Sequence, residues 1–262
     1  MLINELEHMV KTGQFEELSK RLDTVMYSDY METCHLNIAM KGMDHVEARN
    51  AIEKADKIGL ELDSVTFNTL ISRAKRFGTE KLCEDIVEEM KIRGISHDNH
   101  TERALSLSMA EANRITTAEM LKLRRRGYKK SVLHMIDTLF RNDRADELHV
   151  QTALGACETP GELHRLLTHT KRCKIDLNED TKRFVRFASD RVLSVSCVGI
   201  VKRVMKDKGY GFVQCNEDGL YVYFRLSDVN PEGDVNIGDE LSFRVRNNLG
   251  QKNPRAVSIT TV

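Results

Sequence analysis

The spacing of the apolar residues changes once along this chain, close to residue 195, and that change limits what the chain can fold into. Up to Ser194, apolar side chains recur at steps of three and four residues, which is the period of an α-helix. From Val198 onward they alternate at steps of two, between short segments rich in Gly, Asn and Asp. One pattern cannot serve both structures. We therefore predict an α+β protein in separate domains, with helices in residues 1–194 and a β-barrel in residues 195–262.

A repeat is visible inside the helical part. Gly59 and Asp63 close one predicted helical pair, and Gly94 and Asp98 close another 35 residues later. A fixed period of this length is typical of a solenoid, in which each helical pair buries its apolar face only against its neighbours. The N-terminal domain is therefore predicted to be an all-α helical-repeat solenoid.

The best-formed unit runs from Ser64 to Asp98. Its first helix begins near Val65, a break is expected at Phe77-Gly78, and a second helix follows from Glu80 to Ile92. After this unit the pattern is weaker, although helices are still expected. They are predicted at 101–112, 116–125, 131–140, 147–157, 161–173 and 179–191.

The second predicted strand of the C-terminal domain carries the clearest binding signal. Lys208-Gly-Tyr-Gly-Phe-Val213 alternates aromatic residues with glycine, so Tyr210 and Phe212 face the same side of the strand. On the next strand Tyr223 and Arg225 should reach the same surface, while Val222 and Phe224 turn inward. Neighbouring rings on a solvated sheet form a platform on which nucleic-acid bases stack.

These motifs, preceded by Gly199-Ile-Val-Lys202 and followed by Gly238-Asp-Glu-Leu-Ser-Phe243, resemble the cold-shock domain along its whole length. The resemblance implies a five-stranded antiparallel OB-type barrel, base stacking on Tyr210, Phe212 and Tyr223, and backbone contacts from Lys202 and Lys208.

Three positions depart from the cold-shock pattern. Arg203 replaces the family's usual tryptophan, Arg225 its histidine and Leu226 its phenylalanine. The stacking platform is therefore smaller, although an arginine can stack its guanidinium plane on a base. We expect weaker and more salt-dependent binding. The alternative is a barrel that has lost this role and serves protein contacts.

The unit from Ser64 to Asp98 resembles the pentatricopeptide repeat family. That resemblance implies that Asn68 and Asp98 read one base, with a preference for uridine, and that Val65 sandwiches the base against Tyr30 or His100. The alternative is that Asn68 and Asp98 only cap a helix, because Asp98 directly precedes one.

The preceding unit, from Asp29 to Asp63, also resembles a pentatricopeptide repeat. Its Thr33 with Asp63 resembles the family's guanosine-reading pair. Arg103 occupies the corresponding place in the following unit, where the pattern departs from the family and no base is assigned.

The charges are unevenly distributed although the net charge is zero. Residues 1–64 carry 7 basic and 13 acidic side chains, and residues 114–195 carry 17 and 11. The basic excess indicates either a polyanionic partner or a solvated helix face.

No pattern of catalytic residues is present, and we predict that the protein is not an enzyme. Pentatricopeptide relatives with a nuclease domain carry several metal-binding aspartates, for which residues 195–262 offer no segment. The six cysteines are scattered without a CxxC pair, so we expect reduced thiols, no metal site and no cofactor. There is no secretory signal and no apolar run of about 18 residues. An intracellular location is expected, in the cytoplasm or an organelle matrix.

The predicted function is the binding of single-stranded RNA, with single-stranded DNA as a second candidate ligand, in post-transcriptional RNA metabolism. The repeats would give sequence preference and the barrel would supply stacking. The alternative is a protein-interaction scaffold, since helical solenoids also bind peptides. The sequence names no protein partner.

Overall fold

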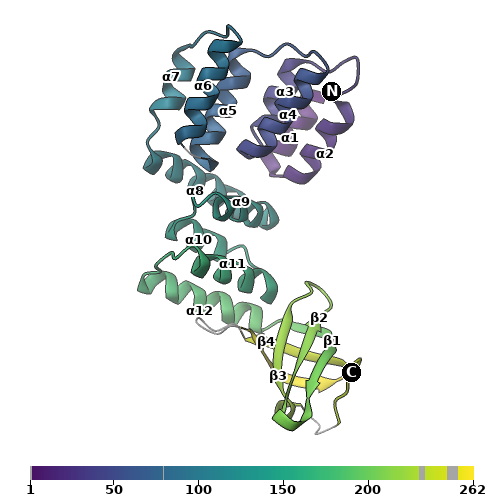
Figure 1. The fold of residues 1–262 in the computed structure, drawn as a ribbon. Helices are drawn as coiled ribbons and strands as arrows, with labels where there is room; N and C mark the ends of the chain where they lie inside the picture. The colour runs from purple at the N-terminus through teal and green to yellow at the C-terminus, as the bar shows by residue number, and fades with distance from the viewer. Residues whose placement is uncertain (1, 79, 230–233, 247–252) are drawn as a thin grey trace. The chain divides into compact units, whose positions relative to one another are not determined.

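The structure is a computed structural model, and it describes residues 2–78, 80–229, 234–246 and 253–262. Within these residues twelve helices precede a closed five-stranded barrel (Figure 1). The predicted fold class is confirmed. The chain divides into two compact units, residues 1–145 and 146–262, and each is described by itself.

The first unit contains nine of the helices described. Those in the first half are α1 (Leu2–Thr12), α2 (Phe15–Val25), α3 (Thr33–Met40), α4 (His45–Lys57) and α5 (Ser64–Phe77). The rest are α6 (Glu80–Ile92), α7 (Asn99–Ser106), α8 (Met109–Arg125) and α9 (Lys129–Arg141). Helix α5 packs against α3 and α4 on one side and α6 and α7 on the other, the stacking of helical pairs that the 35-residue spacing predicts.

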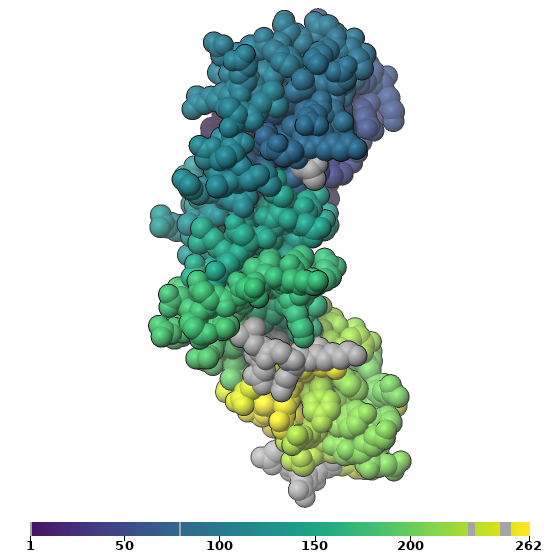
Figure 2. Space-filling view, turned by 60° about the vertical axis from the view of Figure 1, so that its left-hand side comes forward, coloured from purple at the N-terminus to yellow at the C-terminus, as the bar shows by residue number. Residues whose placement is uncertain are grey.

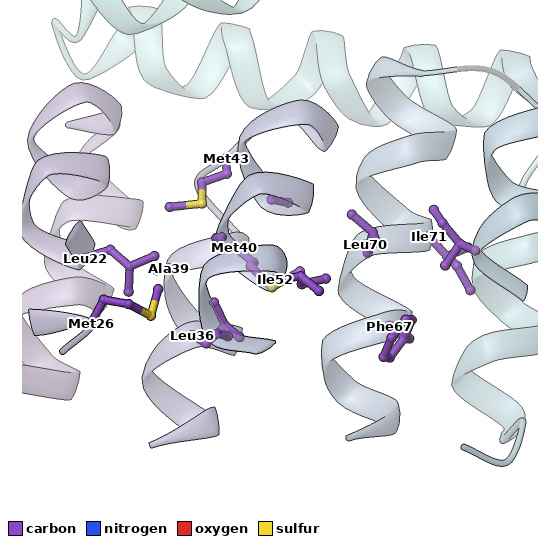
Figure 3. Close-up of a cluster of buried hydrophobic side chains, with 14 of the residues drawn as sticks. Leu22, Met26, Leu36, Ala39, Met40, Met43, Ile52, Phe67, Leu70 and Ile71 are labelled. Carbon is purple, nitrogen blue, oxygen red and sulfur yellow. The ribbon is translucent and has the colours of Figure 1, made fainter. Parts of the chain in front are cut away.

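One continuous apolar core runs through α1 to α6. Figure 3 shows its middle, where Met40 and Leu36 of α3 lie between α2 and α5. Phe67 and Leu70 of α5 are fully buried there. Each helical pair thus buries a face that it could not bury alone.

Buried arginines donate hydrogen bonds to the free backbone carbonyls at the C-terminal ends of some helices. Arg73 of α5 is 5% exposed, and it donates from Nε to the Met43 carbonyl at 2.6 Å and from its guanidinium to the Lys41 carbonyl. These carbonyls lie just beyond α3, where a helix has no internal donors left. Burial lowers the pKa of Arg73 to about 9, which leaves it protonated at neutral pH.

The same arrangement recurs further along the first unit. Arg144 is 7% exposed and donates to the carbonyls of Lys75 and Gly78, at the end of α5, over 2.9 and 2.6 Å. A positive charge at a helix C-terminus also favours the helix dipole.

The second unit begins with three helices. They are α10 (Glu147–Leu154), α11 (Pro160–Arg172) and α12 (Glu179–Leu193), which pack against one another. Arg191 of α12 donates to the carbonyls of Leu154 and Cys157 at 2.8 Å, so the end of α10 is closed in the same way. No described helix is both long and apolar enough to cross a lipid bilayer.

The barrel strands are β1 (Ser196–Met205), β2 (Tyr210–Cys215), β3 (Tyr221–Arg225), β4 (Glu240–Arg246) and β5 (Arg255–Thr261), in the closed order β1-β2-β3-β5-β4. Among the described strands four neighbouring pairs are antiparallel, and β3 with β5 is parallel. Short 3₁₀ turns, η1 (Lys206–Lys208) and η2 (Leu226–Asp228), precede β2 and follow β3. Closure leaves the barrel without an unpaired edge.

Alternation along the strands fills the barrel. Val213, Val222 and Phe224 point inward and are fully buried. Gly211 is required between them, because a Cβ there would come within 2.6 Å of the Phe224 ring and of the Arg203 carbonyl oxygen. The glycine of the Tyr-Gly-Phe motif thus makes room for an aromatic residue on the next strand.

We expect Arg73→Met to lower the free energy of unfolding by about 2 kcal/mol, because two carbonyls at the end of α3 lose their donors inside the stack. Urea denaturation followed by circular dichroism measures the change. Arg114→Met removes an exposed arginine of α8 and should change stability by less than about 0.5 kcal/mol. Equal effects of the two substitutions would contradict this role for Arg73.

Candidate nucleic-acid interface

Three aromatic rings gather on one face of the barrel. Tyr210 and Phe212 of β2 lie with ring centroids 5.9 Å apart, and Tyr223 of β3 lies 5.5 and 6.0 Å from them. All three side chains are half-buried, whereas the residues between them are buried. We call Tyr210, Phe212 and Tyr223 the ring platform. The platform has the inward and outward alternation that the sequence predicts, and its rings keep an exposed surface.

Strand register places the cations beside these rings. Arg203 of β1 is paired with Phe212, and Arg225 of β3 is paired with Tyr210. Lys202 lies at a register shift in β1 and Lys208 ends η1. All four are exposed, and none makes an ion pair or side-chain hydrogen bond with any residue that the structure describes.

Two other cations of the barrel are engaged. Lys206 forms a 2.8 Å ion pair with Asp234, and Arg255 forms one of the same length with Asp228. The four cations at the predicted site, like the exposed Arg244 and Arg246 of β4, have no such partner among the described residues and are available for an anionic ligand.

Sequence reasoning missed Arg255. It opens β5 and is the parallel partner of Tyr223, so it borders the ring platform. Its hydrogen bond and ion pair with Asp228 raise its pKa. No local motif marks this residue, because only the closure of the barrel brings β5 beside β3. Leu226, where the family has phenylalanine, instead lies half-buried against the barrel core.

A groove of about 600 Å³ lies in the first unit, and α5 and α7 provide most of its lining. Four predicted residues line it: Val65, Asn68, Asp98 and His100, together with Arg103. Val65 is 48% exposed, as a base-sandwiching side chain would need. Tyr30 is 60% exposed and is not among the lining residues, so His100 is the neighbour that the structure offers to Val65.

Asn68 and Asp98 are joined directly. The Asn68 amide donates to the two Asp98 carboxylate oxygens at 3.0 and 3.2 Å, and the Thr101 hydroxyl donates to the Asn68 carbonyl oxygen at 2.6 Å. Asp98 also caps α7 by accepting the amides of His100 and Thr101, both at 2.8 Å. The hydrogen bonds from Thr101, Asn68 and His100 lower the pKa of Asp98 to about 2, against some desolvation. The capping role is therefore present, and base reading stays a prediction.

The structure places Asn37, and not Thr33, across from Asp63. The Asn37 amide donates to the Asp63 carboxylate at 3.1 Å, as Asn68 does to Asp98. Thr33 is the first residue of α3, and its hydroxyl donates to the Glu61 carbonyl at 2.5 Å. Asn37 and Asn68 are each five residues past the N-cap of their helix, Glu32 or Asp63. Counting from the cap, rather than by a 35-residue period, would have found Asn37.

Asp63 is held much as Asp98 is. Burial raises its pKa, but hydrogen bonds from Thr66 and Asn37 outweigh burial, and the net effect is a lowered pKa. The Asn37 carbonyl oxygen is buried and accepts no hydrogen bond from the described residues, whereas that of Asn68 accepts one from Thr101.

Basic side chains gather where α8 passes into α9. Lys122, Arg125, Arg126 and Lys130 are exposed around Gly127, which has a φ of 85°. They account for much of the basic excess seen in the sequence, and they lie in the first unit.

One group of possible metal ligands occurs in the described residues, formed by Glu32, Cys34 and His35 at the start of α3. His35 Nδ1 accepts the Glu32 amide at 3.1 Å, and the Cys34 thiol lies 3.5 Å from the Glu32 carboxylate. Burial and this carboxylate raise the pKa of the Cys34 thiol. These contacts describe a helix start, so we assign no metal to the group.

The barrel matches a known family model. Residues 197–262 match the family model of the 'Cold-shock' DNA-binding domain. The predicted cold-shock resemblance is confirmed, and with it a nucleic acid as the class of ligand for this domain. No curated protein matches the chain.

Solved structures similar to the chain fall into two groups. Drosophila Unr CSD456 is 22% identical with a TM-score of 0.23, over 26% of this chain and 27% of that one. The chain thus spans about a quarter of that structure's length. The PPR domain of Arabidopsis thaliana protein-only RNase P 1, in complex with tRNA, is 11% identical with a TM-score of 0.34, over 71% of this chain and 96% of that one. The pentatricopeptide repeat protein PPR10, in complex with an 18-nt psaJ RNA element, is 15% identical with a TM-score of 0.33, over 74% and 41%.

The lowered pKa of Asp98 predicts a pH dependence. Its ordinary value is 3.8 and its folded value about 2, so the stabilisation is present above about pH 4 and is lost as the pH falls toward 2. Asn caps a helix about as well as Asp but does not titrate. The stability difference between wild type and Asp98→Asn should therefore shrink between pH 4 and pH 2.

Urea midpoints measured across this range test the prediction. Asp85→Asn changes an exposed aspartate of α6 that makes no hydrogen bond or ion pair with a described residue. If Asp85→Asn alters the pH profile as much as Asp98→Asn does, the assignment to Asp98 is wrong.

Proposed function

We propose that this protein binds single-stranded RNA, with the barrel stacking bases and the repeats adding sequence preference. The observation that carries the proposal is the ring platform, bordered by four exposed cations that form no ion pair with an acidic residue in the described part of the chain. Single-stranded DNA is the second candidate ligand, and its relative affinity is part of the test.

The chemistry of the platform suits unpaired bases. Each base has a flat apolar face that can lie on an aromatic ring, and stacking is worth about 1 to 3 kcal/mol per base. Arg203 is next to Phe212 in the sheet, so its guanidinium plane can extend the stack where the family has tryptophan. Lys202, Lys208 and Arg225 are placed to neutralise phosphates.

The groove of the first unit suits a polar readout. Asn68 and Asp98 line the groove, and outside its lining the 6% exposed Asn37 makes a second amide-to-carboxylate hydrogen bond of the same kind to Asp63. Two units with one pair should prefer one base, which the family resemblance gives as uridine. The guanosine preference expected from Thr33 is therefore not carried into the proposal.

Linkage of the two surfaces in one chain should raise affinity. When a strand is held by one surface, its effective concentration at the other is increased without any new contact. RNA long enough to reach both surfaces should therefore bind more tightly than a short fragment does.

The proposal is for a binding protein and not an enzyme. The acidic groups with altered pKa in the helical repeats are engaged in structure: Glu119 pairs with Arg76, Asp56 with Arg93, and Asp98 caps α7. A post-transcriptional role in RNA metabolism would follow from the ligand. A protein scaffold is the outcome if no RNA binds.

The double substitution Tyr210→Ala, Phe212→Ala should weaken binding of a single-stranded uridine oligonucleotide by about tenfold or more, the loss of at least one stacked base. Fluorescence anisotropy at low salt measures the affinity. Ile237→Ala, which removes a 68% exposed apolar side chain of the same barrel, is the control and should bind as wild type does. Unchanged affinity of the double variant would remove the main support for the proposal.

Asn37→Ala should reduce the preference for uridine over adenine oligonucleotides several-fold, because the Asp63 carboxylate loses the amide hydrogen bond that orients it. Thr33→Ala, one helical turn away in α3, should leave that preference unchanged. Competition binding with the two oligonucleotides gives the ratio. The reverse result, with Thr33 controlling the preference, would restore the 35-residue register predicted from the sequence.

A further inference from the structure

The last helix of the repeats, α12, carries aromatic and basic residues on its exposed face. Phe184 is 48% exposed and Phe187 is 70% exposed. Arg183 and Arg186 alternate with them and are also exposed. The opposite face is packed, since Val185, Ala188 and Val192 are buried. In Figure 2 side chains from this green stretch of the chain project from the surface. Two phenylalanines in water need a reason that packing within the chain does not give.

The position of this face in the repeat follows from counting along the helix. In α5, whose N-cap is Asp63, the fifth, sixth and ninth residues after the cap are Asn68, Thr69 and Ser72, and all three line the groove. In α12, whose N-cap is Asn178, the same positions are Arg183, Phe184 and Phe187. Helix α12 thus presents rings and a cation on the face with which α5 lines the groove. No described helix covers it, since Phe184 and Phe187 stay exposed and the next element along the chain is β1, from Ser196.

The charges on this face are available. Arg186 makes no ion pair or hydrogen bond with any described residue. Among the described residues Arg183 makes one ion pair, with Asp180 at 3.4 Å, in which 69% and 74% of the two side chains are exposed. Glu179 lies near both arginines; its closer partner Lys182 lowers its pKa most, and the two arginines add to that effect. Solvent screens an exposed pair such as Arg183 with Asp180, and a phosphate can replace it. Each phenylalanine therefore has an arginine next to it in the sequence that can bind an anion.

We propose that Arg183, Phe184, Arg186 and Phe187 form a second stacking surface for single-stranded nucleic acid. Bases lie on the two phenyl rings, and the two guanidinium groups bind the phosphates between them. Neither ring carries a hydrogen-bonding group, so the surface accepts any base. This inference rests on the proposed function and adds a site to it.

Charge complementarity favours a nucleic acid here over an apolar protein segment. An apolar protein segment would leave the two arginines beside the rings without anionic partners, whereas the phosphates of a nucleic acid supply them. The site is also close to the barrel along the chain. Leu193, the last residue of α12, is six positions after Phe187, about 9 Å of helical rise, and β1 starts at Ser196. Helix α12 also contacts β4, so the proposed surface and the barrel belong to the same compact unit.

The absence of tryptophan from the sequence gives a direct test. In the full-length Phe187→Trp variant the only indole is at the proposed site. Its emission should be quenched when a single-stranded uridine oligonucleotide binds, because a base stacks on it. Tyr27→Trp places an indole at a position that is also 70% exposed, on the first unit, and should not respond. An indole at residue 187 that is silent while anisotropy reports saturated binding overturns the proposal.

Affinity measurements separate the possible occupants. The double variant Phe184→Ala, Phe187→Ala should bind at least about fivefold more weakly, as expected for one stacked base. Phe184→Leu, Phe187→Leu keeps apolar bulk without rings and should be equally weak. Full affinity of the leucine variant overturns stacking and makes the face a site for an apolar protein partner.

The proposed function fails in a distinguishable way. If Tyr210→Ala, Phe212→Ala weakens binding and the α12 variants do not, only the second surface is lost. If the wild-type protein binds no RNA or DNA, both proposals are overturned.

Discussion

The helical part depends on hydrogen-bonding the backbone groups at the ends of its helices, because stacking of the repeats removes those ends from water. Every helix leaves backbone donors at its start and acceptors at its end without partners. Here aspartates provide acceptors at the starts, as Asp63 and Asp98 do for α5 and α7. Arginines provide donors at the ends, as Arg73 does for α3 and Arg144 for α5. The aspartate that caps the start of a helix is thereby fixed beside the asparagine of the preceding repeat. The paired asparagine and aspartate side chains are thus a consequence of how the helix starts are capped.

The ring platform of the barrel results from a different constraint, the two-residue period of a β-strand. Phe224 fills the interior and therefore demands glycine at residue 211, which leaves Tyr210 and Phe212 side by side outside. The rings contact one another, so each is half-buried and held in place before any base arrives. A base that stacks on fixed rings orders few side chains, and less conformational entropy is lost on binding.

Much of this arrangement could be predicted from the sequence, and the failures have local causes. The bounds of α6 and the break after Phe77 follow from periodicity and glycine. A single helix was expected over 101–112, but the chain breaks at Leu107, and Ser108 starts α8 by capping the Glu111 amide. The Ser-x-x-Glu pattern there is a readable start signal. Asn37 was missed because the unit before Asp63 is shorter than 35 residues. Arg255 could not be found, since only barrel closure pairs it with Tyr223.

The same reasoning from helix starts explains why the two kinds of surface occur in one chain. A polar side chain five residues after the cap faces the next aspartate only while another repeat follows, as Asn68 faces Asp98. After α12 the next described element is strand β1 and not another repeat, so no N-cap aspartate faces the fifth residue of α12. A polar pair would have nothing to hold it there, whereas a phenyl ring stacks without a partner from the protein. The change from asparagine and serine in α5 to arginine and phenylalanine in α12 thus coincides with the loss of a following aspartate.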